Sequence, residues 1–281
     1  MKKAALLIAI LVAVAVLAAN EIKVVYGHAA STTQSSFADD AQKPEVTEEF
    51  HQTYPLSPAG RVSVSNINGD VHINVWDQNS VKVDAVKRAR SQQSLSEVTI
   101  EVTNTADSVK VKTRYPENNN YNRRDREDGA ASVEYTLTVP RGASLDGAEL
   151  VNGSLDVEGI QGDVHAALVN GTVKATGLGG EVKLSTVNGG IGADLAALQS
   201  AKEVTLNSVN GPIVLIIPGG ASADVKASTV HGAITNDFGL AVEDGPYVGH
   251  NLSGQIGSGG TRVRLNNVNG PIAIKRAGSV M

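Results

Sequence analysis

Residues 151–195 read VNGSLDVEGIQGDVHAALVNGTVKATGLGGEVKLSTVNGGIGADL, and this stretch decides the fold. Glycines occupy positions 153, 162, 171, 180 and 189, so a spacing of nine residues recurs along it. A short run of alternating apolar and polar residues follows each glycine, which is typical of a strand with one buried face. Every second glycine completes the triplet VNG, so the underlying period is 18 residues. Asn-Gly is a strong turn signal because both residue types tolerate positive φ.

The triplet returns outside this regular block. It occurs in NING (66–69), VNGP (209–212), VHGA (230–233) and VNGP (268–271). The segments VPRGAS (139–144) and IPGGAS (217–222) each lead into a strand and a further VNG or VHG. We therefore expect two related segments that share one architecture.

A unit of nine or 18 residues cannot bury its own apolar stripe, so it must stack on its neighbours. The sequence therefore predicts an all-β fold, a β-solenoid or β-roll of short stacked strands with VNG turns. Hydrophobic residues make up 41% of the chain and aromatic residues 4%, which suits a thin core of small branched side chains. The side chains predicted to point inward are Val164, Ala166, Leu168, Val173, Ala175, Val182, Leu184, Ile191 and Ala193. Those predicted to face water are Asp163, His165, Lys174, Glu181 and Lys183.

Repeats of the form Ser/Thr-Val-Asn-Gly-x-Ile/Val, after the opening VSNINGDVHINVWD (64–77), resemble a known bacterial family. This is the adhesin-type β-strand-repeat family, a domain family of unknown function akin to the GIN-type auto-transporter adhesin head. The resemblance covers residues 50–276. It implies an exported all-β domain with a surface or adhesion role, and it transfers no catalytic residues.

The N-terminal residues 1–19 read MKKAALLIAILVAVAVLAA, the layout of a secretory signal peptide. An uncleaved N-terminal anchor is the alternative interpretation. We expect a flexible polar tether at 20–48 and a β-strand-repeat domain at 49–281 with an exposed loop at 116–130. The expected location is the periplasm, the outer surface or the medium. The absence of cysteine fits an envelope protein that relies on its fold alone.

The formal net charge of −5 argues against the basic surface of a nucleic-acid-binding protein, so we expect no nucleic-acid partner. Contact with a membrane is expected only through an uncleaved N-terminal segment. The expected partner is an envelope protein or glycan of unknown identity.

The turn positions of the repeats predict a structural ladder, in which stacked side-chain amides hydrogen-bond from coil to coil. Asparagine in the left-handed conformation would also ease each turn. The predicted members are Asn68, Asn152, Asn170, Asn188, Asn210, His231 and Asn269.

Three patterns bear on catalysis or metal binding, and each favours a structural interpretation. GDVH occurs at 69–72 and 162–165, but no third ligand or partner recurs at a fixed spacing. GGIGADL (189–195) matches a calcium β-roll motif, but the neighbouring units carry lysine where that motif needs aspartate. The carboxylates available for glycoside hydrolysis are Asp146, Asp156, Glu158, Asp163 and Glu181. Residues 145–230 contain no aromatic platform for a sugar.

We therefore expect no enzyme, and no catalytic, cofactor-binding or metal-binding residue. The leading hypothesis is a non-enzymatic exported binding or structural module of the cell envelope, adhesin-like in character. One alternative is an envelope sensor or regulatory domain that contacts a membrane partner. The other is a carbohydrate-active enzyme on a β-helix.

Overall fold

The computed structural model describes residues 45–116, 131–198, 203–245 and 248–278. These ranges contain 21 strands and one helix, α2 (Gln92–Ser96). The Ser91 hydroxyl caps this helix by accepting a hydrogen bond from the Ser94 amide at 3.2 Å. The predicted all-β fold of short stacked strands with VNG turns is confirmed.

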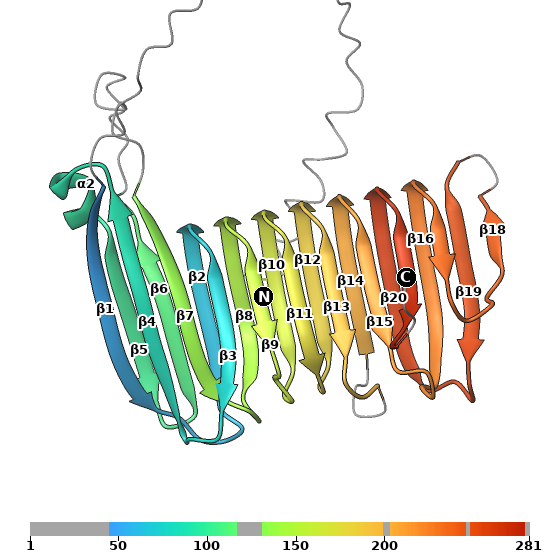
Figure 1. The fold of residues 1–281 in the computed structure, drawn as a ribbon, viewed down its shortest axis with the longest axis horizontal. Coiled ribbons are helices and arrows are strands. Elements are labelled where there is room, and N and C mark those ends of the chain that lie inside the picture. The colour runs from blue at the N-terminus through green and yellow to red at the C-terminus, as the bar shows by residue number, and fades with distance from the viewer. Residues whose placement is uncertain (1–44, 117–130, 199–202, 246–247, 279–281) are drawn as a thin grey trace, which may run out of the picture. The chain divides into compact units, whose positions relative to one another are not determined.

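The strands form two sheets, and from β7 to β17 consecutive strands alternate between them, so each coil there contributes one strand to each sheet (Figure 1). The ten-stranded sheet contains, in spatial order, β1 (Val46–Pro55), β4 (Ser80–Ala89), β7 (Ser132–Pro140), β3 (Val71–Trp76), β9 (Leu155–Glu158), β11 (Val173–Leu178), β13 (Ile191–Leu195), β15 (Ile213–Ile217), β21 (Ile272–Arg276) and β17 (Ile234–Asn236). The eleven-stranded sheet contains β18 (Val242–Asp244), β19 (His250–Ile256), β16 (Ala223–His231), β20 (Thr261–Asn269), β14 (Glu203–Asn210), β12 (Val182–Asn188), β10 (Val164–Asn170), β8 (Ser144–Asn152), β2 (Arg61–Asn68), β6 (Ser108–Arg114) and β5 (Thr99–Thr105).

Neighbouring coils pair in parallel through the middle of both sheets, and antiparallel strands complete the two ends. At one end β1, β4 and β7 pair antiparallel, as do β5 and β6. At the other end β19 pairs antiparallel with both β16 and β18. The parallel register places each repeat residue beside its equivalent, as in Asn170↔Asn188 and Val173↔Ile191.

The core consists of small branched side chains from both sheets, gathered in one cluster. All nine side chains that the alternation predicted to point inward are 7% exposed or less. Their five predicted outward partners are exposed or half-buried. Tyr135 is a large exception in this thin core, and its hydroxyl bonds to the Thr113 hydroxyl at 2.7 Å.

Buried polar side chains lie beneath most of the turns, two residues before Asn68, Asn188, Asn210, His231 and Asn269, whereas Leu150 and Leu168 take this position before Asn152 and Asn170. Thr186 donates to the Gly171 carbonyl at 3.0 Å, and Ser208 donates to the Gly189 carbonyl at 3.1 Å. Thr229 and Asn267 bond to turn carbonyls in the same way. The Ser/Thr of the repeat motif therefore satisfies carbonyls that the ladder of backbone bonds leaves unpaired.

The domain begins earlier than the sequence predicted. Residues 46–48, assigned above to the tether, are the first residues of β1, which pairs with β4 along its whole length. Only Val46, Phe50 and Tyr54 of β1 are partly buried along its inward side, so the strand lacks a period-two signal. The predicted signal peptide (1–19), the tether up to residue 44 and the loop at 117–130 lie outside the described residues. The one helix in the described ranges, α2, is neither long nor apolar enough to span a membrane.

Asn66 is the member of the buried polar row with the most partners, and it provides a test of that row. Its amide donates to the carbonyls of Asn68, Gly69 and Val133, the last at 2.7 Å, while it is 2% exposed. We predict that Asn66→Asp lowers the free energy of unfolding by about 3 kcal/mol or more, because a carboxylate cannot donate to these oxygens. The exposed Asn74→Asp should change it by at most about 0.5 kcal/mol. Chemical denaturation measures both, and equal values would contradict the role of Asn66.

Candidate functional site

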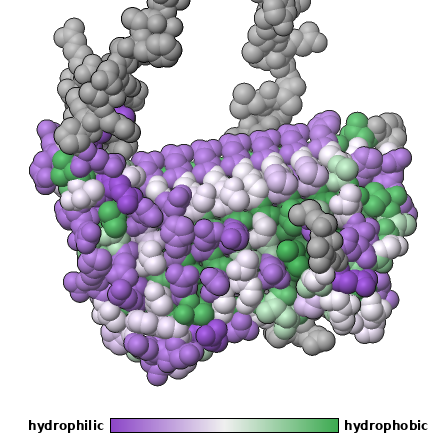
Figure 2. Space-filling view, in the orientation of Figure 1, coloured by the Kyte–Doolittle hydropathy of each residue, from purple (hydrophilic) through white to green (hydrophobic). Residues whose placement is uncertain are grey.

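The side chains of the VNG asparagines form a continuous hydrogen-bonded row across the eleven-stranded sheet. Each amide nitrogen donates to the amide oxygen of the preceding coil at 2.8–3.0 Å. The row runs in the order Asn68, Asn152, Asn170, Asn188, Asn210 and Asn269. His231 lies beside Asn269 by strand register, and its carbonyl accepts from the Gly270 amide at 2.7 Å. In Figure 2 a regular hydrophilic row follows the edge where these strands end.

The conformation expected for these asparagines is wrong in one respect. Among the described residues only glycines have positive φ, so the asparagines stay extended. Of the glycines that follow them, Gly69, Gly189, Gly211 and Gly270 have positive φ, whereas Gly153 and Gly171 do not. The glycine is also required by close stacking. A Cβ at Gly171 would lie 2.0 Å from the Gly153 carbonyl oxygen, and one at Gly189 would lie 2.0 Å from that of Gly171. Asn68 is half-buried, and the other five asparagines of the row are exposed to solvent.

Asn170 tests the contribution of one amide. Asn170→Ala removes a bond donated to Asn152 and one accepted from Asn188, both at 2.8 Å. Because the row is exposed and no positive-φ residue is replaced, we predict a loss of about 0.5–1.5 kcal/mol in the free energy of unfolding. Lys174→Ala, on an exposed position of the same coil, should cost at most about 0.5 kcal/mol. Denaturation curves in which both variants lose the same stability would refute a stabilising ladder.

The two GDVH segments lie on different sheets, and their aspartates bond to backbone. Asp70 accepts from the Ser154 amide at 2.7 Å, next to the ten-stranded sheet. Asp163 accepts from the Glu181 amide at 2.9 Å, next to the eleven-stranded sheet. Each aspartate therefore joins its coil to the next one, which explains the repeated motif without a metal or an acid–base pair.

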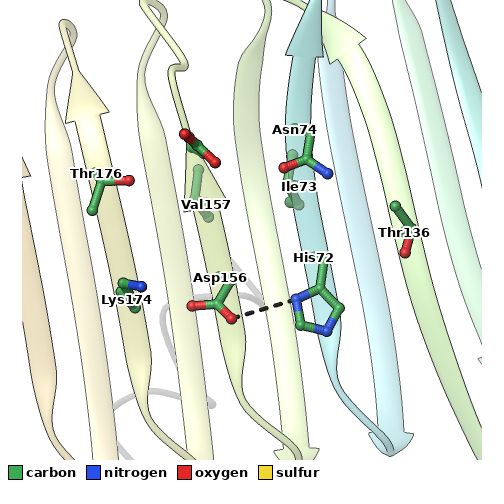
Figure 3. Close-up of a pocket in the computed structure, with 9 residues that line it drawn as sticks. His72, Ile73, Asn74, Thr136, Asp156, Val157, Lys174 and Thr176 are labelled. Atoms are coloured by element: carbon green, nitrogen blue, oxygen red, sulfur yellow. Dashed lines mark ion pairs between the residues drawn. The ribbon is translucent and has the colours of Figure 1, made fainter.

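His72 of the first GDVH segment lies in a hollow on the outer face of the ten-stranded sheet (Figure 3). The hollow has a volume of about 340 Å³ and extends over β7, β3, β9 and β11. Strand register places Thr136, His72, Asp156 and Lys174 side by side in one row. We call this the His72 hollow; its lining also includes Asn74, Glu158 and Thr176.

His72 contacts a carboxylate on each side. His72 Nδ1 lies 3.4 Å from Asp156 Oδ2, and its Nε2 lies 3.9 Å from Glu134 Oε1. Glu134 also pairs with Arg88 of β4. Both signs of charge thus occur at fixed positions on one open face, an arrangement suited to holding a polar partner.

The five carboxylates considered for glycoside hydrolysis fall into two groups, of which Asp156 and Glu158 both line the His72 hollow. Asp156 and Glu158 belong to β9 in the ten-stranded sheet, whereas Asp146, Asp163 and Glu181 lie in or beside strands of the eleven-stranded sheet. The hydrogen bond from Lys183 holds the pKa of Glu181 below its usual range, the opposite of what a general acid needs. In the calcium-type motif GGIGADL, the residue beside Asp194 on the adjacent strand β15 is Ile216, which has no side-chain oxygen to share a calcium ion. Within the described ranges, no three His, Asp or Glu side chains cluster closely enough to hold a metal ion.

Comparison with known proteins places this geometry in a family. The sequence matches the Toastrack DUF4097 family over residues 53–275, which is most of its length. The chain belongs to this family. The match confirms the resemblance to an adhesin-type β-strand family of unknown function. No curated protein matches this Toastrack chain.

Several solved structures are similar to the Toastrack chain. A "putative cell adhesion protein" from Clostridium sporogenes is 13% identical with a TM-score of 0.47, covering 82% of this chain and 100% of that chain. A "putative adhesin" from Bacteroides fragilis is 12% identical with a TM-score of 0.34, covering 82% of this chain and 97% of that chain. A "putative lipid binding protein" from Parabacteroides distasonis is 10% identical with a TM-score of 0.26, covering 82% and 96%.

Sequence reasoning missed the His72 hollow of this Toastrack domain because its residues are distant in the chain. Thr136 and Asp156 reach His72 only because β7 and β9 pair with the two edges of β3. Period-two alternation identified which side chains face outward, but it could not identify their lateral neighbours. Thr186 and Ser208 could have been identified from the sequence, because they are the Ser/Thr that opens the repeat motif. The sequence analysis did not assign a role to that position.

His51 on the same outer face belongs to a charged group at the end of the sheet. Its Nδ1 lies 2.7 Å from Asp84 Oδ1 and its Nε2 lies 3.1 Å from Glu49 Oε2, while Lys82 bonds to Asp84 at 2.8 Å. The hydrogen bond with Asp84, followed by that with Glu49, raises the pKa of His51. Burial raises the pKa of Asp84, but hydrogen bonds from Lys82 and His51 outweigh it, so the net pKa is lowered.

These directions set the sign of a pH effect. A raised His51 pKa stabilises the fold at low pH and loses its effect as pH rises through the folded value. A lowered Asp84 pKa stabilises the fold above the usual carboxyl range and loses its effect as pH falls through the folded value. The pair therefore stabilises the fold most at pH values between the folded pKa of Asp84 and the folded pKa of His51.

We predict that the midpoint of the His51 titration followed by NMR lies above pH 6.5 and that it falls in the variant Asp84→Asn. It should not move in Asp77→Asn, and an unchanged midpoint in Asp84→Asn would contradict the pairing.

Proposed function

We propose that this Toastrack protein is a non-enzymatic, exported binding module of the cell envelope with an adhesive role. The observation that supports the proposal best is the His72 hollow. His72, Asp156 and Lys174 lie side by side on three strands, and the backbone hydrogen bonds between these strands fix their register. Such a surface presents donors, acceptors and both charges to a partner without rearrangement, which lowers the entropic cost of binding.

The chemistry of this hollow favours recognition over turnover. His72 contacts carboxylates on both sides, and no Ser or Thr hydroxyl bonds to its ring among the described residues. A nucleophile–base pair needs such a bond at about 2.6–3.2 Å.

The family resemblance is consistent with this role and with export through the N-terminal segment. An adhesive module presents a rigid, polar face, and the two sheets supply such faces on either side of the core. The partner class that suits mixed charge and hydroxyl groups is an envelope protein or glycan. A sensor domain with a membrane partner would use the same face and differs in the partner it meets.

A retention experiment tests the proposal. Full-length protein immobilised on beads should retain cell-envelope fragments. The double variant Asp156→Asn, Lys174→Gln should retain about tenfold fewer fragments, because it removes two charges from the hollow. Lys110→Gln, an exposed change on the other sheet, serves as the control and should match the wild type.

Treatment of the fragments separates the partner classes. Loss of retention after protease treatment indicates a protein partner, and loss after periodate oxidation indicates a glycan. Retention equal to that of beads without protein would overturn the proposed binding function. Retention that does not change in the double variant would remove the His72 hollow from it.

A further inference from the structure

A second hollow, also of about 340 Å³, lies on the outer face of the eleven-stranded sheet. It extends over β20, β16 and β19, which are neighbours near one end of that sheet (Figure 1). Its outward side chains stand in two rows of three, because the strand register aligns them. One row is Arg264, Lys226 and Ser253, and the other is Asn266, Ser228 and Asn251. We call this site the Lys226 hollow.

The first row places two cations side by side. Lys226 of β16 lies opposite Arg264 of β20, and like charges directly opposite one another destabilise a strand pair. Arg264 has a carboxylate partner in Glu203. Lys226 has none among the described residues, and Asp224 on the same strand face is engaged by the Gly260 amide at 3.2 Å. An anion seated between the two cations would relieve their repulsion.

The second row is neutral and able both to donate and to accept. Ser228 donates to Asn266 Oδ1 at 3.2 Å, and Asn266 donates to Asn207 Oδ1 at 2.9 Å. Asn251 stands on the other side of Ser228 by strand register. Amides and hydroxyls of this kind match the hydroxyl groups of a saccharide, which also donate and accept.

The dimensions and composition of the Lys226 hollow restrict the size and the charge of the ligand that it can bind. Three strands span about 10 Å and two residues along a strand span about 7 Å, the scale of one or two sugar rings. The lining contains no aromatic side chain, so affinity for a neutral sugar by ring stacking is not available. Charge-assisted hydrogen bonds from Lys226 and Arg264 must supply the affinity, which requires a carboxylate or similar anion.

An acidic peptide fits this site less well. A peptide binds a sheet most readily by adding a strand to a free edge. Both edges of β16 are already paired, with β19 and with β20, so its backbone offers no such edge. The peptide would have to rely on side chains alone.

We propose that the Lys226 hollow binds an acidic saccharide. The carboxylate of the sugar lies between Lys226 and Arg264, and the sugar hydroxyls contact Ser228, Asn251 and Asn266. This site lies on the sheet opposite the His72 hollow and does not depend on it.

Calorimetric titration of the full chain with a linear hexamer of galacturonate tests the inference at low salt. We expect binding that weakens with added salt, and no binding of the neutral maltohexaose. Lys226→Gln should weaken the galacturonate affinity about tenfold, because it removes one charge-assisted bond. Ser228→Ala should weaken it less, and Lys110→Gln, on the same sheet but away from the hollow, should leave it unchanged. Equal thermal melting of all variants confirms that they are folded.

Each contrary outcome overturns the inference. A hexaglutamate peptide that binds as tightly as galacturonate would identify a general anion patch, as would full competition by inorganic phosphate. Equal weakening by Lys226→Gln and Lys110→Gln would remove the site from this hollow. If galacturonate fails to bind while envelope fragments are still retained on beads, the saccharide assignment falls and the proposed binding function stands.

Discussion

In-register stacking of the coils at the VNG turn is the constraint on which the rest of this structure depends. The turn glycines of adjacent coils approach so closely that any side chain at Gly171 or Gly189 would collide with the backbone of the preceding coil. On the outside of this contact the asparagine amides bond from coil to coil, and on the inside Thr186 and Ser208 bond to glycine carbonyls. One short motif therefore satisfies the polar groups on both sides of the turn.

This stacking turns a local repeat into two surfaces with fixed spacing. Because equivalent residues lie abreast, a side chain that faces outward in one coil forms a row with its equivalents in the next. The His72 hollow and the Lys226 hollow both arise where such rows carry charge and hydrogen-bonding groups. A thin apolar core is sufficient because every inward row packs against the inward row of the other sheet.

The two ends of the stack are built differently from the middle, since a coil at an end has a neighbouring coil on one side only. Antiparallel strands β1, β4 and β5 complete one end, with the buried Lys87 pairing with Glu48 and donating to the Val98 carbonyl. At the other end the Asn236 side chain bonds to the backbone of Phe238 and Leu240, and Arg276 lies 5.1 Å from the centre of the Phe238 ring. β1 and β17 remain the edge strands of the ten-stranded sheet, and β18 and β5 those of the eleven-stranded sheet.

The sequence by itself determined the all-β class, the 18-residue spacing of the central coils, their inward and outward faces and the six asparagines of the row, but not the place of His231, whose side chain does not bond to the row among the described residues. These are properties of period and turn chemistry, which act over a few residues. Only the tertiary structure decided which coils are neighbours: β20 lies between β14 and β16, so Asn269 rather than His231 follows Asn210. The start of β1 and the partners of His72 were decided in the same way. All VNG copies are nearly equivalent as stacking partners, so the local pattern carries no information about order. That order, and with it both hollows, depends on long-range strand pairing.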